Sequence, residues 1–164
     1  MTTTTGTRID LGTELPTVQI TREFDAPRSK VFRAHTDPEL VRQWLGPRGL
    51  EMTVDRWDCR TGGEYRYIHS RNGEEFAFHG SFHEVRPEQL IVQTFTYEGM
   101  PDSVALEKLV LTDLGDGRTR LVATSLADSF EARDAMVAGG METGIVEGYE
   151  RLDELLAEVL IEKA

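Results

Sequence analysis

The sequence has a single cysteine, Cys59, among its 164 residues. Because an internal disulfide or a metal site built from several thiolates needs more than one cysteine, neither is possible in this chain. Basic residues are also scarce: 29 acidic residues stand against 18 basic ones and give a formal net charge of -11. Nucleic acids and anionic membranes attract basic surfaces, so we expect neither as a partner.

Long apolar runs are missing as well. No stretch approaches the roughly 20 apolar residues that span a bilayer, and the threonine-rich start, Met1 to Thr7, lacks the features of a secretory signal. We therefore expect a cytoplasmic protein. Residues 1–15 are expected to form a flexible N-terminal arm and residues 16–164 a single domain, since no linker or repeat divides them.

Motifs that bind cofactors are missing too. The chain has no phosphate-binding loop, no dinucleotide fingerprint and no serine-centred elbow, so no cofactor is expected. His79 and His83 share one face of a predicted strand, but they lack a third ligand, so no metal site is assigned.

The order of elements predicts an α+β domain. Alternating residues predict a strand over 18–24, and two Asp/Pro helix starts predict short helices over 28–35 and 38–45. Turn residues then separate strands that we expect to form an antiparallel meander, at 50–58, 63–71, 74–84, 89–98, 104–114 and 119–126. A long helix is predicted from Asp128, its N-cap, with Glu131 completing a capping box, to about Glu162, and Gly139-Gly140 is expected to bend or interrupt it.

The most informative segment is the hairpin at residues 63–84. Asn72-Gly73 is the preferred pair for a two-residue type I′ turn, and this turn pairs Arg71 with Glu74 and fixes every pairing outward from it. Because side chains alternate along a strand, one face then collects the large aromatic residues. Aromatic side chains with an imidazole, a carboxylate and a glycine are more typical of a cavity lining than of an aliphatic core.

The candidate binding residues come from this face, from the next strand, from the second short helix and from the apolar side of the long helix. They are Trp44, Tyr65, Tyr67, His69, Phe76, Phe78, Phe82, Phe95, Tyr97, Met141, Ile145 and Gly148. Any single aromatic residue could equally fill the core. Gly148 lies within the apolar arc of the helix, which suggests either a close approach by the sheet backbone or space for a guest molecule.

Several local sequences, in this order, resemble the bacterial branch of the heat-shock-protein-90 ATPase activator homologues, in the START-like (SRPBCC) superfamily. They are Phe24-Asp25-Ala26-Pro27-Arg28, Thr36-Asp37-Pro38-Glu39, Trp44-Leu45-Gly46-Pro47, Gly62-Gly63-Glu64-Tyr65 and Glu84-Val85-Arg86-Pro87. The resemblance implies a helix-grip fold, in which a curved antiparallel sheet of about six to seven strands wraps around the long C-terminal helix. It also implies a cavity between the sheet and that helix.

Three functions remain open on these grounds. The first is non-catalytic binding of a small apolar ligand, such as an aromatic, polyketide-like or acyl molecule. The second is cyclase or dehydratase chemistry, for which His69 and Glu84 are the weak catalytic candidates, because they are the ionisable residues on the inward hairpin face. A strand-end carboxylate such as Glu84 is more often tied to backbone or to an arginine. The third is modulation of a chaperone ATPase, while the protein partner and the oligomeric state are left open.

Overall fold

The computed structural model describes residues 2–4 and 6–163 of the chain. Its strands form one antiparallel sheet in the order β1-β2-β3-β9-β8-β7-β6-β5-β4. The elements are β1 (Thr2–Thr4), β2 (Thr7–Leu11), β3 (Thr17–Phe24), α1 (Arg28–Thr36), α2 (Pro38–Trp44), β4 (Glu51–Trp57), β5 (Glu64–Arg71), β6 (Glu74–Arg86), β7 (Leu90–Tyr97), β8 (Ala105–Gly115), β9 (Arg118–Leu126), α3 (Phe130–Ala138) and α4 (Met141–Lys163).

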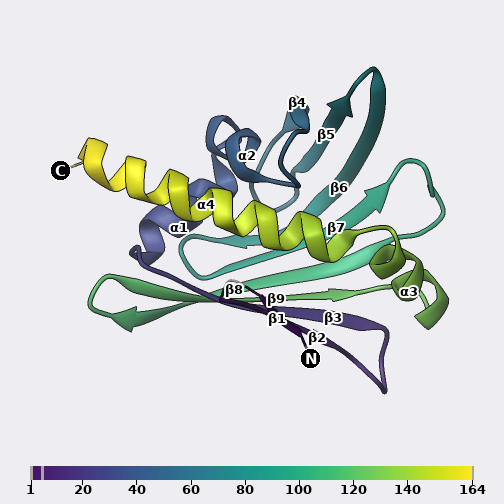
Figure 1. Cartoon of the computed structure of the whole chain (residues 1–164), viewed down its shortest axis with the longest axis horizontal. Coiled ribbons are helices and arrows are strands. Elements are labelled where there is room, and N and C mark those ends of the chain that lie inside the picture. Colours follow the sequence, from purple (N-terminus) through teal and green to yellow (C-terminus); the bar gives the residue numbers. More distant parts are fainter. Residues whose placement is uncertain (1, 5, 164) are drawn as a thin grey trace.

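The sheet curves around α4, which crosses one face of it (Figure 1). The short helices α1 and α2 lie against α4, and α2 also contacts β4. This is the helix-grip arrangement expected from the sequence. The sheet is larger than expected, because the described residues form nine strands where six to seven were predicted.

The additional strands come from the N-terminus, where a flexible arm over 1–15 was predicted. That prediction is wrong for β2, which pairs with β3 through Ile9 and Ile20. Thr7 is fully buried, and its hydroxyl accepts a 3.0 Å hydrogen bond from Nε of Arg22. Arg22 also donates a 2.6 Å hydrogen bond to Asp153, so one buried guanidinium ties β2 and β3 to α4. Threonine favours strands, and this propensity accounts for order in a segment whose composition looks like that of an arm.

The predicted long helix is divided at Gly139-Gly140 into α3 and α4, and Gly140 adopts a φ of +94° that favours glycine. The N-cap of α3 is one residue later than predicted: the Ser129 hydroxyl accepts a 3.0 Å hydrogen bond from the Ala132 amide. Asp128 instead accepts a 2.9 Å hydrogen bond from the amide of Val104. The start of α3 is thereby tied to the loop before β8.

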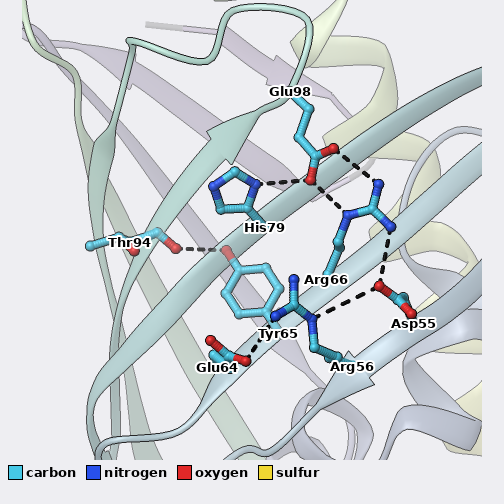
Figure 2. Close-up of polar contacts among 8 residues, drawn as sticks. All are labelled: Asp55, Arg56, Glu64, Tyr65, Arg66, His79, Thr94 and Glu98. Carbon is cyan, nitrogen blue, oxygen red and sulfur yellow. Dashed lines mark hydrogen bonds and ion pairs between the residues drawn. The ribbon is translucent and has the colours of Figure 1, made fainter.

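The hairpin of β5 and β6 has the predicted register. Arg71 pairs with Glu74, and Tyr67 pairs with Phe78. On its outer face, Arg66 donates hydrogen bonds of 2.8 Å and 3.0 Å to Glu98 and one of 3.1 Å to Asp55 (Figure 2). Hydrogen bonds from Arg66 and then from His79 lower the pKa of Glu98 to about 2. A polar network therefore covers this face, and the aromatic side chains lie on the other.

One predicted inward residue leaves that face. A β-bulge between Phe82 and Glu84 adds a residue to β6, so the alternation of side chains reverses after it. Val85 packs against the aromatic cluster in its place, and Glu84 forms a 2.7 Å ion pair with Arg86 on the surface. The assignment of Glu84 to the inner face is therefore corrected.

The main core lies beneath the C-terminal half of α4. Leu152, Leu155 and Leu156 pack there against Phe24 and Leu121 from the sheet. The N-terminal half of α4, from Met141 to Gly148, has no such filling beneath it and covers a cavity instead.

Candidate functional site

A cavity of about 720 Å³ lies between the inner face of the sheet and the N-terminal half of α4. Strands β3 and β5 to β9 supply its floor, and residues of α2, α3 and α4 cover it. This volume is in the range of ligand-binding cavities, about 300–1,000 Å³.

The aromatic residues of the hairpin form one wall, with Phe78 in the middle. Its ring centroid lies 5.2 Å from that of Tyr67, 5.4 Å from that of Phe95 and 5.3 Å from that of Tyr97. Phe76 also borders the cavity. Rings packed at these separations form a continuous apolar wall, which suits an apolar guest.

Eleven of the candidate binding residues border the cavity, and one does not. Those that border it are Trp44, Tyr65, Tyr67, His69, Phe76, Phe78, Phe95, Tyr97, Met141, Ile145 and Gly148. Phe82 is buried beside the cavity, between Trp57 and Tyr65, at centroid distances of 6.0 Å and 5.2 Å. Trp57 itself borders the cavity and donates a 2.7 Å hydrogen bond from its indole to the Thr36 carbonyl.

His69, which was predicted on the inward face of the hairpin, is only 5% exposed. The end of α2 covers it so closely that a Cβ on Gly46, whose φ is +95°, would lie 2.7 Å from Cε1 of its ring. Burial lowers the pKa of His69, and the Leu45 carbonyl counteracts this in part. Its Nε2 is buried without a hydrogen-bond partner. Because Glu84 lies on the surface, the two weak catalytic candidates do not meet.

Of the two reasons predicted for Gly148, room for a guest is consistent with its place at the edge of the cavity, whereas a close approach by the sheet backbone is wrong. A Cβ there would lie 3.3 Å from the Trp44 carbonyl and 3.4 Å from the Gly46 amide nitrogen, so the close approach is by the end of α2, not by the sheet. Trp44 also stacks on Tyr149 of α4 and donates a 2.8 Å hydrogen bond to the Ala34 carbonyl. These contacts hold α2 against α4 at one end of the cavity.

Sequence reasoning missed a polar row on the floor of the cavity. Gln93 of β7 pairs with Glu107 of β8, which pairs with Ser125 of β9, and all three border the cavity. The part of Glu107 that remains accessible borders the cavity. Burial raises the pKa of the Glu107 carboxyl, and Ser125 and then Gln93 lower that pKa in part. The only sequence signal was that Glu107 alternates with Leu109 and Leu111 and so lies on the same face of the strand as these apolar residues. Leu106 and Val110 hide this signal, because they place apolar residues on the opposite face as well.

Tyrosine side chains lie close to this row. Burial, and secondly the charge of Glu107, raise the pKa of Tyr65, Tyr67 and Tyr149, so all three carry their phenolic protons at neutral pH. Tyr65 donates a 2.6 Å hydrogen bond to the Thr94 carbonyl (Figure 2). It reaches that carbonyl across Gly80, where a Cβ would lie 2.0 Å from the Thr94 oxygen.

The cavity meets solvent near the N-terminal end of α4. Met100 and Val104, in the loop between β7 and β8, are 46% and 44% exposed and border the cavity together with the exposed Gly140. A second, smaller hollow beside Pro47, Leu50 and Phe76 also includes Gly140. This end of the cavity is therefore the entrance.

Other candidate chemistry receives no support among residues 2–4 and 6–163. They contain no group of three or more His, Cys, Asp or Glu side chains placed to hold a metal ion. None of the helices in this part of the chain is long and apolar enough to cross a bilayer. Burial, and then Asp58, raise the pKa of the Cys59 thiol to about 11, so it is not an activated nucleophile.

Comparison with known proteins finds relatives that span nearly the whole chain. Residues 25–157 match the family model for "Activator of Hsp90 ATPase homolog 1-like protein". A crystal structure from Rhodobacter sphaeroides is 27% identical with a TM-score of 0.84, covering 93% of this chain and 99% of the other. A solution NMR structure from Arthrobacter aurescens is 25% identical with a TM-score of 0.86, covering 94% and 93%. A crystal structure from Chromobacterium violaceum is 26% identical with a TM-score of 0.77, covering 85% and 96%. No curated protein matches.

Proposed function

This chain belongs to the family of activator of Hsp90 ATPase homolog 1-like proteins, and from that premise we propose that it binds a small, largely apolar molecule in the cavity beneath α4. The observation that carries the proposal is a cavity of about 720 Å³ lined mainly by aromatic and aliphatic side chains. An empty space of this size inside a packed protein lowers its stability, because the atoms that line the space lose dispersion contacts unless a guest fills it.

The aromatic wall supports an aromatic, polyketide-like or acyl guest. Phe78 and Phe95 stack on each other in this wall, and α4 supplies the opposite side with Met141 and Ile145. Aromatic rings pack well against an aromatic or acyl guest, and the flexible methionine adapts to an irregular one.

The other two functions find less support in the site. Cyclase or dehydratase chemistry needs an acid and a base at the substrate, and His69 and Glu84 lie apart, with Glu84 on the surface. Modulation of a chaperone ATPase rests on the family description alone.

The test is binding of N-phenyl-1-naphthylamine, a neutral fluorescent aromatic probe, to a matched pair of variants. Phe78→Asp places a charge on the cavity wall and is expected to abolish binding, because an unpaired buried charge is strongly unfavourable. Ser81→Asp places the same charge on the exposed outer face of the same strand and is expected to bind like the wild type. Circular dichroism checks that both variants fold.

Because Phe78→Asp could unfold the protein, Ala123→Phe provides a neutral second variant. Ala123 lies on the inner face of β9 beside the cavity, so a phenyl group there occupies guest volume without adding charge. Equal probe binding by the wild type and by both cavity variants would refute the proposal.

A further inference from the structure

The polar row on the cavity floor lies in otherwise apolar surroundings. Gln93, Glu107 and Ser125 are direct neighbours across three adjacent strands. Their neighbours along the same strand faces also border the cavity and are apolar: Ile91, Phe95, Ala105, Leu109, Ala123 and Ala127. A single formal charge at the centre of an apolar floor is unfavourable unless something satisfies it.

The protein satisfies this row only in part. Gln93 Nε2 donates one N–H to Glu107 Oε1 over 3.2 Å and the other to the Tyr65 hydroxyl over 3.3 Å, so Glu107 receives a single hydrogen bond from Gln93. The Ser125 hydroxyl lies beside Glu107 on the next strand and is close enough to lower the pKa of that carboxyl, but its buried oxygen forms no hydrogen bond of ordinary length and angle. Among the described residues, no cationic side chain contributes to the pKa of Glu107. Acceptor capacity therefore remains on the floor of the cavity.

The other ionisable groups of the cavity do not offset that charge. Burial lowers the pKa of His35 to about 4 and also lowers that of His69, so both rings are neutral at neutral pH. Lys108 and Asp128 border the cavity but are exposed. The interior thus presents carboxyl and hydroxyl acceptors beside uncharged aromatic side chains.

We propose that Glu107, supported by Gln93 and Ser125, is the polar anchor of the cavity, and that the ligand is an apolar or aromatic molecule bearing a protonated amine. This inference rests on the proposed binding function and narrows its ligand class. An ammonium group has three N–H donors and no acceptor, so it complements the oxygens of Glu107 and Ser125. A ligand carboxylate, as in a fatty acid, would face Glu107 with like charge, and the net charge of -11 would oppose its approach.

The experiment compares three probes with one aromatic body and different end groups: 2-(1-naphthyl)ethylamine, 2-(1-naphthyl)ethanol and 1-naphthylacetic acid. Calorimetric titration at pH 7 is expected to rank the amine tightest and the acid weakest. The isosteric change Glu107→Gln is expected to weaken amine binding on the order of tenfold to a hundredfold, as for loss of a charged hydrogen bond, and to leave the alcohol nearly unchanged.

Glu75→Gln is the matched control, because it removes the same charge from an exposed position on the outer hairpin face and should leave amine affinity within twofold. Equal affinities for all three probes, a preference for the acid, or equal losses in Glu75→Gln and Glu107→Gln would overturn the anchor while leaving the cavity as a binding site. Failure of every probe to bind the wild type would instead count against the proposed function itself, and the anchor would be rejected with it.

Discussion

Replacement of Glu107 by glutamine should stabilise the free protein, and the gain should grow with pH. Burial raises the pKa of the Glu107 carboxyl in the folded state above its value in the unfolded chain. The folded state then binds this proton more tightly, so stability that is fully present below the unfolded pKa is lost as pH rises through the folded pKa. Glutamine cannot ionise, and its amide oxygen can still accept the hydrogen bond from Gln93.

The size of this effect follows from one proton. Between the unfolded and folded pKa values, the variant should gain on the wild type by at most about 1.4 kcal/mol of unfolding free energy per pH unit. For a chain of 164 residues this corresponds to a difference in melting temperature of about 3–6 °C per pH unit. Thermal unfolding of both proteins from pH 4 to pH 8 measures it, and the difference should level off at the folded pKa of Glu107.

Glu75→Gln corrects for the change in net charge, because it removes one surface carboxylate from the exposed outer face. A stability difference for Glu107→Gln that stays flat with pH would refute the burial of a carboxyl in the cavity. A wild type that gains on the variant as pH rises would show that a cation already pairs with Glu107 in the folded protein.

Two further predictions concern packing. Gly80→Ala should lower the free energy of unfolding by about 2–4 kcal/mol in urea titrations, because its Cβ would meet the Thr94 carbonyl at 2.0 Å and displace the Tyr65 hydroxyl. A variant as stable as the wild type would contradict the close approach of β6 and β7. Cys59, whose thiol has its pKa raised to about 11 by burial, should react with an aromatic disulfide reagent at pH 8 on the order of a hundredfold more slowly in the folded protein than in urea. Equal rates in the two states would show that the thiol is exposed.

Local turn chemistry made most of the sheet predictable. Asn72-Gly73 sets the β5–β6 register, and the cavity wall followed from it because strand side chains alternate. The alternation of side chains reverses where β6 has a bulge after Phe82, and no residue in that segment predicts the bulge. Glu84 was misplaced for that reason.

The anchor was not predictable, because β8 carries apolar residues on both faces. Leu106 and Val110 are exposed, whereas Leu109 and Leu111 face inward with Glu107, so the sequence did not indicate which set was buried. Gly148 was recognised as unusual, but its neighbour is the end of α2, a tertiary contact that helical periodicity does not encode. The composition of the N-terminus suggested a flexible arm, but Thr7 is buried there and hydrogen-bonded to Arg22.

The pairing of β3 with β9 affects how the chain folds during synthesis. Thr17 pairs with Leu126 and Phe24 with Thr119, so one side of β3 has no partner until almost all strands have been made. Contacts this distant along the chain form slowly, because a large loop must close before they stabilise the fold. Since α4 follows β9, the apolar inner face of the nascent sheet stays uncovered until the last helix leaves the ribosome, and this is the stage at which aggregation competes most directly with folding.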